Sequence, residues 1–337
     1  MGAIKYTFSY LFIVLGYWSL IGEGLQTFAL VIFSFVLIPF LELVLPPNKS
    51  ENRVRHLWVY DLVLYSLIPM YLILFVFFLA TISNETDLVS LVGKVSAMGM
   101  LCGIFGINMA HELGHRLSKV DRFFAQLLLA TSQYTHFYIE HNRGHHKRIG
   151  TPEDPATARK NENLYRFWIR VIKDSYLSAW ELEKQRLKRS GVPYWSIKNA
   201  MVRYAVVQII IVIAILLFGG PKVTMCYLAA ALFGIILLET INYIEHYGLV
   251  RKKIGKTAYE RVQVVHSWNS DHMLGRFLLF ELTRHSHHHE NSLKKYPELT
   301  SKENASQLPA GYPAMMVLSL FPPLWFRVMN KRLPSNS

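Results

Sequence analysis

Six apolar stretches constrain this chain more than any other feature of its sequence. Stretches of about 20 apolar residues are long enough for a helix to cross the roughly 30 Å hydrocarbon core of a bilayer. Gly and Pro occur where such helices must stop, as in the sequence GGP at 219–221. We therefore predict an all-α integral membrane protein with six transmembrane helices, at about residues 6–21, 25–45, 58–82, 89–110, 202–218 and 223–245.

The distribution of basic residues predicts which side of the membrane each connection faces. The connection at 46–57 and the long segment at 111–200 are rich in Lys and Arg, and so is the chain after Tyr247. The connection at 82–87 has two acidic residues and no basic one. Cytoplasmic loops of membrane proteins carry an excess of Lys and Arg. With six spans, the basic segments and both termini then lie in the cytoplasm, and a bacterial inner membrane is the expected location.

The two long segments outside the apolar stretches, 111–200 and 246–337, are expected to form a helical cap on the cytoplasmic side. Residues 164–189 mix apolar and charged positions at helical spacing, which predicts one or two amphipathic helices. The apolar stretch at 311–329 is interrupted by prolines, so we interpret it as an interfacial or docking element and not as a seventh span. We expect residues 1–337 to form a single domain.

The charge and the cysteines narrow the function classes. The formal net charge is +13. The basic cytoplasmic segments explain this excess, which is also compatible with contacts to anionic lipid and to an acidic protein partner. Nothing in the sequence is typical of a nucleic-acid-binding module. The two cysteines, Cys102 and Cys226, lie in apolar stretches and are too few for a four-cysteine iron site. An iron–sulfur or rubredoxin-like electron carrier must therefore be a separate chain.

Histidines are concentrated in the part of the chain assigned to the cytoplasmic side. Of the 14 histidines, 13 lie between residues 111 and 289, and none of these is in the middle of an apolar stretch. Four blocks stand out: HELGH at 111–115, EHNRGHH at 140–146, NYIEHYG at 242–248 and RHSHHHE at 284–290. Residues three or four apart share a helix face. Three blocks can therefore present several ring nitrogens in one direction: His111 with His115, His141 with His145, and His285 with His288 and His289.

Such clustered histidines predict a metal site, because packed imidazoles repel when protonated and gain little when neutral unless a metal binds them. HELGH alone matches the zinc-protease pattern, with two ligands one helical turn apart and a Glu as general base. A catalytic zinc, however, takes only three protein ligands. Eight or nine phased histidines suit two metals with four or five nitrogens each. This favours a membrane di-iron oxygenase over a zinc protease. A metal transporter would need polar ligands along the spans, which these spans lack.

Five longer motifs resemble one known family. They are NMAHELGHR, HFYIEHNRGHHKRIGTPEDPATAR, NYIEHYGLVR, HSWNSDHMLGRFLLFELTRHSHHHEN and GYPAMMVLSLFPPLWFRVM. They extend from residue 108 almost to the carboxyl end, and they resemble the integral-membrane alkane monooxygenases, a family of non-haem di-iron alkane hydroxylases. Xylene monooxygenases share much of the pattern. Fatty-acid desaturases and lipid hydroxylases share only the looser histidine boxes.

The resemblance implies nine iron-ligating histidines, all of them in the four blocks. They are His111, His115, His141, His145, His146, His246, His285, His288 and His289. Helical spacing leads to the same set, except that it does not exclude His287. The family usually has Asp at that position, in a box reading His-Ser-Asp-His-His. Here an imidazole replaces a carboxylate that would orient a ligand, and His287 stays open as an additional ligand.

Other polar residues in these motifs are candidates for orienting the ligands, because ligating histidines usually donate their second N–H to a carboxylate or carbonyl. The candidates are Glu112, Glu140, Asp154, Asn242, Glu245, Asp271 and His287. In this interpretation Glu112 is not the base of a protease. Three more histidines lie in the motifs but outside the nine, and either an orienting role or simple packing stays open for each: His136, His266 and His272.

The resemblance also implies a reaction. A membrane di-iron monooxygenase would hydroxylate the terminal methyl of an alkane or alkyl chain to a primary alcohol with O₂. Its cofactor would be two iron ions, and its electrons would come from a rubredoxin with an NAD(P)H-dependent reductase. Membrane lipid and a hydrophobic alkyl substrate are the other expected partners, and nucleic acid is not. A fatty-acyl or lipid desaturase or hydroxylase is the alternative, and an intramembrane zinc metalloprotease is a more distant one.

Overall fold

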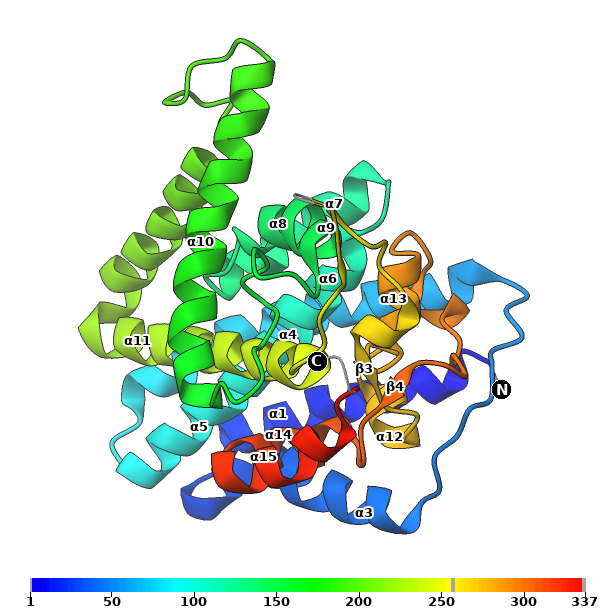
Figure 1. Ribbon diagram of the computed structural model, residues 1–337. Coiled ribbons are helices and arrows are strands. Elements are labelled where there is room, and N and C mark those ends of the chain that lie inside the picture. Colours follow the sequence, from blue (N-terminus) through cyan, green and yellow to red (C-terminus); the bar gives the residue numbers. More distant parts are fainter. Residues whose placement is uncertain (1, 256–257, 335–337) are drawn as a thin grey trace. The chain divides into compact units, whose positions relative to one another are not determined.

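The computed structural model describes residues 2–255 and 258–334, and almost all of their regular structure is helical (Figure 1). The α-helices are α1 (Tyr10–Ile21), α2 (Ala29–Ile32), α3 (Ile38–Val44), α4 (Leu57–Asn84), α5 (Leu88–Leu101), α6 (Met109–Gly114), α7 (Lys119–Thr131), α8 (Phe137–Glu140), α9 (His146–Arg148), α10 (Leu164–Arg189), α11 (Ala200–His246), α12 (Met273–Leu278), α13 (His285–Glu290), α14 (Tyr312–Ser319) and α15 (Pro322–Met329). The predicted helical character is confirmed.

Shorter elements connect these helices. The 3-10 helices are η1 (Ile4–Ser9), η2 (Gly24–Phe28), η6 (Val264–His266), η7 (Tyr296–Glu298) and η8 (Asn330–Arg332). Three π turns, η3 (Phe33–Leu37), η4 (Cys102–Asn108) and η5 (His141–His145), continue into α-helices. The described strands pair in twos, β1 (Lys253–Ile254) antiparallel with β2 (Ala258–Tyr259), and β3 (Trp268–Asn269) parallel with β4 (Ser306–Gln307).

Five helical stretches in the described part of the chain are long and apolar enough to cross a membrane. The first four agree with the predicted spans to within a few residues. Many of their large apolar side chains are exposed, which is expected where helices contact lipid acyl chains. These stretches indicate a multi-pass membrane protein: Ile4–Ile21, Gly24–Val44, Leu57–Asn84, Leu88–Gly114 and Ala200–His246.

The expected number of six spans is not confirmed, because the last two predicted spans, 202–218 and 223–245, form the single element α11. Its 47 residues correspond to about 70 Å of helix, more than twice the hydrocarbon thickness. Gly220 interrupts the helical backbone at φ 76° and ψ 179°, and Pro221 follows it. Figure 1 shows that the chain changes direction along α11. The GGP sequence thus marks a kink where a separating loop was predicted.

Two predictions about the remaining segments are confirmed. Residues 164–189 form one helix, α10, with the predicted bounds. The apolar stretch at 311–329 forms two helices of eight residues each, α14 and α15, which are too short to cross a membrane.

Contacts divide the chain into two compact units, which are described separately. The first contains Met1–Leu37, Arg53–Tyr138 and Leu187–Leu238. In it α1 packs against α4 and α5, and α6 packs against α7. Gly106, in the π turn before HELGH, allows close packing there. A Cβ at this position would lie 2.0 Å from Oγ of Ser132 and 2.8 Å from the hydroxyl oxygen of Tyr71.

The second unit contains Ile38–Asn52, Ile139–Arg186 and Glu239–Ser337. Two buried arginines fix its short helices. Arg276 Nε donates to Glu281 Oε2 at 2.7 Å. Arg284 donates to the carbonyl oxygens of Leu299 at 2.7 Å and of Ser50 at 2.9 Å. Buried charges are stable only when they are paired and hydrogen-bonded. These contacts therefore fix the start of α13, the helix that carries the last histidine block.

Candidate metal centre

The second unit brings seven histidines together in two groups. Within each group, one ring nitrogen of every member lies within 4.8 Å of the others. Three segments that are far apart in sequence supply these histidines. They are η5 together with α9, the end of α11, and α13. The four-histidine group is His145, His246, His285 and His289, and the three-histidine group is His141, His146 and His288.

In the four-histidine group the Nε2 atoms face one another. His285 Nε2 lies 3.1 Å from His246 Nε2 and 2.8 Å from His289 Nε2. His145 Nε2 lies 3.3 Å from His289 Nε2. All four side chains are buried, with at most 7% of any residue exposed. The three-histidine group has the same character, with His146 Nε2 at 3.0 Å from His141 Nε2 and 3.2 Å from His288 Nε2.

These separations fit a shared metal ion. Metal–nitrogen bonds of about 2.1 Å would place neighbouring nitrogens on one ion about 3.0–3.4 Å apart, close to the spacing in both groups. Burial and the neighbouring imidazoles hold the pKa of His289 well below its ordinary value. Its ring is therefore neutral, which is the form that binds metals. Rings with their Nε2 atoms turned together in this way are a donor set for a metal.

Asp154, one of the residues predicted to orient a ligand, contacts the Nδ1 side of His145 in the four-histidine group. Its carboxylate oxygens lie 3.0 and 3.1 Å from His145 Nδ1. Thr157 Oγ1 donates to the same carboxylate at 2.6 Å, and Ala156 N donates at 3.2 Å. Burial alone would raise the pKa of Asp154, but His145 and the hydrogen bond from Thr157 hold it below its usual value. The carboxylate favours the tautomer with hydrogen on Nδ1, which directs the Nε2 lone pair of His145 toward the other three rings.

Glu245 also reaches this group, but from the inner side. Its Oε2 lies 3.2 Å from His285 Nε2, the atom that faces the other rings. Its Oε1 accepts a hydrogen bond from the hydroxyl of Tyr312 at 2.8 Å. Sequence reasoning missed Tyr312, which is 67 residues away. It also missed Glu239, which accepts a hydrogen bond from Asn242 Nδ2 at 3.0 Å and adds negative charge near His145.

Glu140 and Asp271 have other partners. Glu140 Oε1 accepts from Arg148 Nη2 at 2.7 Å and from Ser178 Oγ at 3.3 Å. Asp271 Oδ2 accepts from Ser301 Oγ at 2.7 Å, while its Oδ1 lies 3.7 Å from Nε of Arg284, the residue before His285.

In the first unit the last four residues of α6 and its C-cap, His115, make up HELGH. The ring centroids of His111 and His115 are 4.9 Å apart, as the one-turn spacing predicts. Glu112 Oε1 accepts from Arg116 Nη2 at 2.9 Å and Nε at 3.2 Å. Arg116 Nη1 also donates to Asp61 at 2.8 Å. A buried arginine thus ties the glutamate of HELGH to α4.

Three further motif histidines lie outside the two groups. His266 Nδ1 accepts from Gln263 N at 2.9 Å. His272 Nδ1 lies 3.0 Å from Ser270 Oγ. His136, in the first unit, packs edge-on against the ring of Tyr134, and burial lowers its pKa to about 3.

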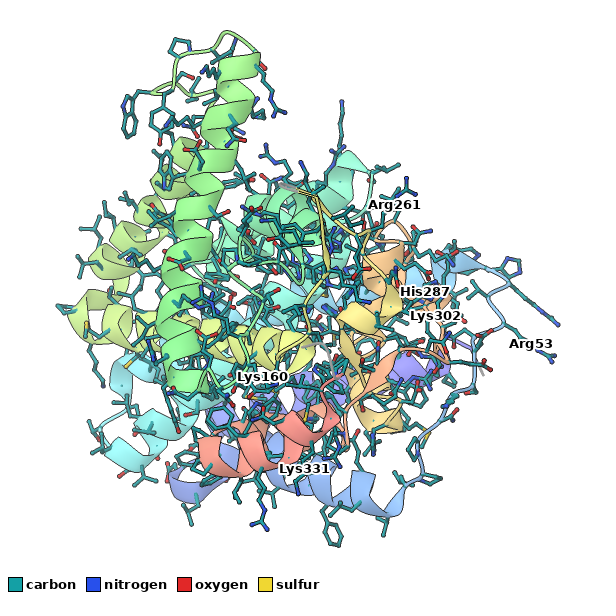
Figure 2. All side chains as sticks on the ribbon, viewed as in Figure 1. Arg53, Lys160, Arg261, His287, Lys302 and Lys331 are labelled. Atoms are coloured by element: carbon teal, nitrogen blue, oxygen red, sulfur yellow. The ribbon has the colours of Figure 1, made fainter. Side chains whose placement is uncertain are left out.

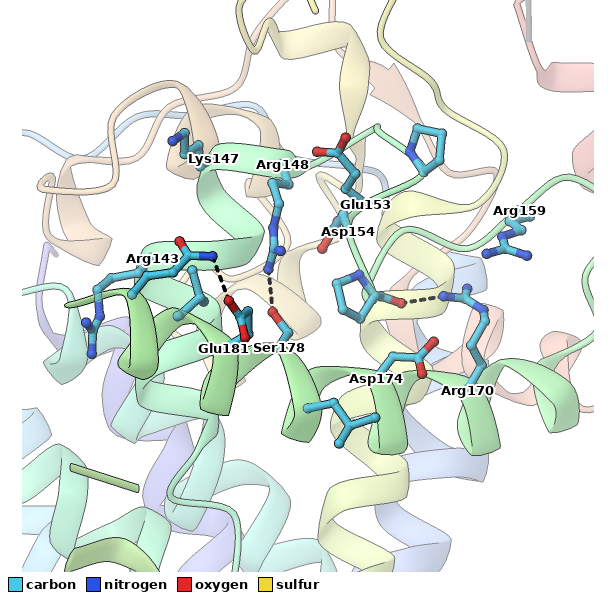
Figure 3. A pocket seen from close by; sticks show the side chains of 15 residues that line it. Arg143, Lys147, Arg148, Glu153, Asp154, Arg159, Arg170, Asp174, Ser178 and Glu181 are labelled. Atoms are coloured by element: carbon cyan, nitrogen blue, oxygen red, sulfur yellow. Dashed lines mark hydrogen bonds between the residues drawn. The ribbon is translucent and has the colours of Figure 1, made fainter. Parts of the chain in front are cut away.

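A charged cavity of about 590 Å³ lies in the second unit, beside α10 (Figure 3). Its lining includes Asp154, the partner of His145, together with Arg143 and Lys147. Figure 3 shows Arg148 reaching Ser178 across the cavity wall, at 2.6 Å. The cavity therefore extends from the surface to a carboxylate that contacts a histidine of the four-histidine group.

Comparison with known proteins agrees with this donor set. A sequence model of the fatty acid desaturase family matches residues 88–319. The alkane 1-monooxygenase of Pseudomonas putida is 36% identical over 292 residues, which are 86% of this chain and 72% of that protein. Alkane 1-monooxygenase 2 of Pseudomonas aeruginosa is 34% identical over 95% of this chain and 88% of its own length. The chain belongs to the alkane 1-monooxygenase family. The xylene/toluene monooxygenase hydroxylase component of Pseudomonas putida is more distant, at 27% identity over 94% of this chain and 82% of that protein.

This family member carries a histidine at position 287, and the structure gives it partners outside both groups. Thr300 N donates to His287 Nδ1 at 2.8 Å, and Lys294 Nζ lies 3.1 Å from Nε2. Burial, with Lys302 and Lys294 adding to it, lowers the pKa of His287 to about 4. Figure 2 shows His287 beside Lys302. The side chain is therefore neutral, and both of its nitrogens face other residues.

Proposed function

We propose that this chain is a membrane di-iron monooxygenase that hydroxylates the terminal methyl of an alkane or alkyl chain to a primary alcohol. The observation that carries this proposal is the pair of histidine groups with converging Nε2 atoms, buried except for half-buried His146, in a chain of the alkane 1-monooxygenase family. His111 and His115 would complete the ligand set. The other seven would be His141, His145, His146, His246, His285, His288 and His289.

Two iron ions bound by these residues would supply the activation of O₂. The overall reaction takes R–CH₃, O₂, two electrons and two protons to R–CH₂OH and water. The chain's own residues hold the donor set. Asp154 keeps hydrogen on His145 Nδ1 so that Nε2 is available. Tyr312 holds the carboxylate of Glu245 against His285 Nε2. Burial of the rings excludes water, and it holds the pKa of His289 below its ordinary value.

The electrons would come from a separate rubredoxin, reduced by an NAD(P)H-dependent reductase. Rubredoxins are acidic, so a basic surface would attract one. The cavity beside α10 supports this role because its lining, which carries both basic and acidic side chains, includes exposed Lys147 and also Asp154, which contacts His145. Arg251 binds the carbonyl oxygen of Lys147 at 3.0 Å and extends the basic surface.

We also propose that α11 supplies two spans, which meet at Gly220, and that the protein crosses a bacterial inner membrane six times. The length of α11 and the break in its backbone support this topology. Both termini and the metal centre would then lie in the cytoplasm, in accord with the basic segments that flank the spans.

The alternative is a fatty-acyl or lipid desaturase or hydroxylase. The match of the fatty acid desaturase family to residues 88–319 favours it. Product analysis separates the two activities, because a desaturase converts its chain to an alkene, whereas the proposed enzyme gives a primary alcohol. The intramembrane zinc protease would leave seven histidines of the second unit without a role.

The test begins with elemental analysis of the detergent-solubilised protein after anaerobic reconstitution with ferrous iron. We expect about two irons per chain, and then terminal hydroxylation of a linear alkane with rubredoxin and its reductase. His288→Ala should lose iron and activity. His272→Ala is the matched control, since this ring lies outside both groups, and it should lose neither. One zinc per chain with no recoverable iron would refute the proposal.

A further inference from the structure

A short loop at residues 190–199 connects α10 to α11 and belongs to the first unit. It carries two exposed apolar side chains, because Trp195 is 76% and Ile197 is 80% exposed. A single exposed apolar residue needs no explanation on a protein surface. A large aromatic ring and an aliphatic chain two residues apart on one short loop are less ordinary. We refer to these two side chains as the apolar tip of the loop.

The chain enters this loop through a defined helix ending. Gly191, at φ 62°, follows the last turn of α10. Its N–H donates to the carbonyl oxygen of Lys188 at 3.2 Å, and the N–H of Val192 donates to that of Leu187 at 3.0 Å. These two hydrogen bonds with a left-handed glycine make up the Schellman helix ending. The loop therefore leaves α10 in one defined direction.

Side-chain contacts fix the rest of the loop. Asn199 Nδ2 donates to the carbonyl oxygen of Tyr194 at 2.9 Å. Arg203 Nη1 donates to the carbonyl oxygen of Ile197 at 2.8 Å. The rings of Tyr194 and Trp195 pack edge to face, with centroids 4.9 Å apart. The apolar tip is thus held in its exposed position before any partner binds, which lowers the entropy cost of binding.

The charges near the apolar tip are all of one sign. Residues 187–203 contain no acidic side chain, and their basic side chains are all exposed: Lys188, Arg189, Lys198 and Arg203. A cationic surface around an apolar tip fits a partner that is anionic outside and apolar just beneath. The surface of a bilayer that contains anionic phospholipid has both properties, because its charged headgroups cover acyl chains.

The position of the loop favours lipid over an acidic protein as this partner. Residues 200–219, the part of α11 before its break at Gly220, are about 30 Å long, which equals the thickness of the hydrocarbon core. In the proposed topology these residues form the fifth span, so Ala200 lies at the edge of the core. The apolar tip, only a few residues earlier, then lies in the headgroup layer, where Trp is preferred and where Lys and Arg reach the phosphates.

We propose that this loop is a membrane anchor, which inserts Trp195 and Ile197 into the anionic lipid surface on the cytoplasmic side. Lys188, Arg189 and Lys198 bind the phosphate groups of these lipids. The hydrogen bonds of the helix ending then hold the end of α10 at the membrane. The inference rests on the proposed topology and not on the proposed reaction.

Fluorescence quenching locates the apolar tip in the full-length protein. Ile197→Cys is labelled with a fluorophore, and the native Cys102 and Cys226 are buried. The protein is placed in vesicles of phosphatidylcholine and phosphatidylglycerol. The quenchers are a phospholipid with a nitroxide next to its headgroup, and iodide in the water. Arg261→Cys is the matched control, since Arg261 is also exposed but does not adjoin an apolar stretch.

We expect the nitroxide lipid to quench the label at position 197 at least threefold more than the label at position 261, and iodide to quench it less. Equal quenching of both labels by the lipid would overturn the proposal. Protection of the label at position 197 only after an acidic rubredoxin is added would also overturn it, because the partner would then be a protein.

The charge of the loop is tested separately. Each Lys or Arg near an anionic membrane strengthens binding roughly fivefold. Lipid quenching at position 197 should therefore fall at least twofold in vesicles of phosphatidylcholine alone. It should fall equally in anionic vesicles when three residues are changed to Gln: Lys188, Arg189 and Lys198. The matched control changes three other exposed basic residues to Gln and should have no effect: Lys252, Lys253 and Arg261. No fall in either test would overturn the role of anionic lipid.

A label at Ile210 separates failure of the topology from failure of the anchor. Ile210 is 58% exposed and lies midway along residues 200–219. A nitroxide near the end of the acyl chain should quench Ile210→Cys carrying the label. No quenching there would refute the fifth span and with it the anchor, whereas quenching there with position 197 open to iodide would refute the anchor alone. None of these measurements uses turnover, so a failure of the proposed hydroxylation would not change them.

Discussion

The contact between Asp154 and His145 allows a quantitative test of the proposed metal centre. Replacing Asp154 with Asn removes the negative charge but keeps the size of the side chain. The Asn oxygen can still accept from Ala156 N and from His145 Nδ1, which lie 3.2 and 3.1 Å from Oδ1. The new amide group would face Thr157, whose hydroxyl can accept as well as donate. The fold should therefore tolerate the substitution.

The expected loss follows from the change in one hydrogen bond. A hydrogen bond to a charged group contributes about 1.5–3 kcal/mol, and one between neutral groups about 0.5–1.5 kcal/mol. The difference of about 1–1.5 kcal/mol corresponds to roughly tenfold in an equilibrium constant. We expect Asp154→Asn to bind iron about tenfold more weakly, at the low end of the roughly 10–100-fold loss found when the hydrogen-bond partner of a ligand is changed.

The assay is competition between the reconstituted protein and a soluble ferrous chelator under anaerobic conditions. Asp154→Asn should release half of its iron at about one tenth of the chelator concentration that the wild type requires. Asp174→Asn is the matched control, because Asp174 lines the same cavity on α10 without contacting a histidine of either group (Figure 3). Equal iron retention in Asp154→Asn and the wild type would refute the reasoning, and so would an equal loss in Asp174→Asn.

Three further predictions concern other parts of the chain. His287→Asp should leave the iron content unchanged by elemental analysis, because His287 contacts Thr300 and Lys294 and neither histidine group; a loss of iron would make His287 a ligand. Arg116→Gln should destabilise the protein by about 3–5 kcal/mol, since it leaves buried carboxylates without their cation; an unfolding midpoint equal to that of the wild type would contradict this. Gly220→Ala should cost about 1–3 kcal/mol of stability, because its φ of 76° and ψ of 179° suit glycine almost alone, and thermal unfolding in detergent would detect it.

The spacing of the histidines predicted which residues converge but not how they divide into groups. His141 and His145 were expected to point in one direction. Their rings do stack, with centroids 5.2 Å apart, yet His141 belongs to the three-histidine group and His145 to the other. The reason is local, since residues 141–145 form a π turn with i→i+5 hydrogen bonds. Such a turn changes the angle around the helix axis between residues four apart. The sequence did not predict the π turn.

The sequence also did not predict contacts between segments that are far apart in the chain. The apolar stretches predicted α4 and its neighbours from hydropathy alone, because a bilayer imposes a minimum length on each span. No periodicity indicates that Tyr312 reaches Glu245, or that Tyr65 reaches Asp121. These contacts depend on how the helices pack, and the sequence of one helix does not contain that information.

Two of the carboxylates predicted to orient histidines form ion pairs with arginines. Glu112 is followed four residues later by Arg116, and Glu140 eight residues later by Arg148, and each pair is in contact. A buried guanidinium must find an anion, whereas a neutral imidazole can satisfy its N–H with any acceptor, including a carbonyl. A nearby carboxylate is therefore expected to pair with an arginine before it contacts an imidazole. Asp154, which no arginine contacts among the described ion pairs, is the one that binds a histidine Nδ1. A carboxylate in such a motif should be assigned first to an arginine on the same helix face, and only then to a metal ligand.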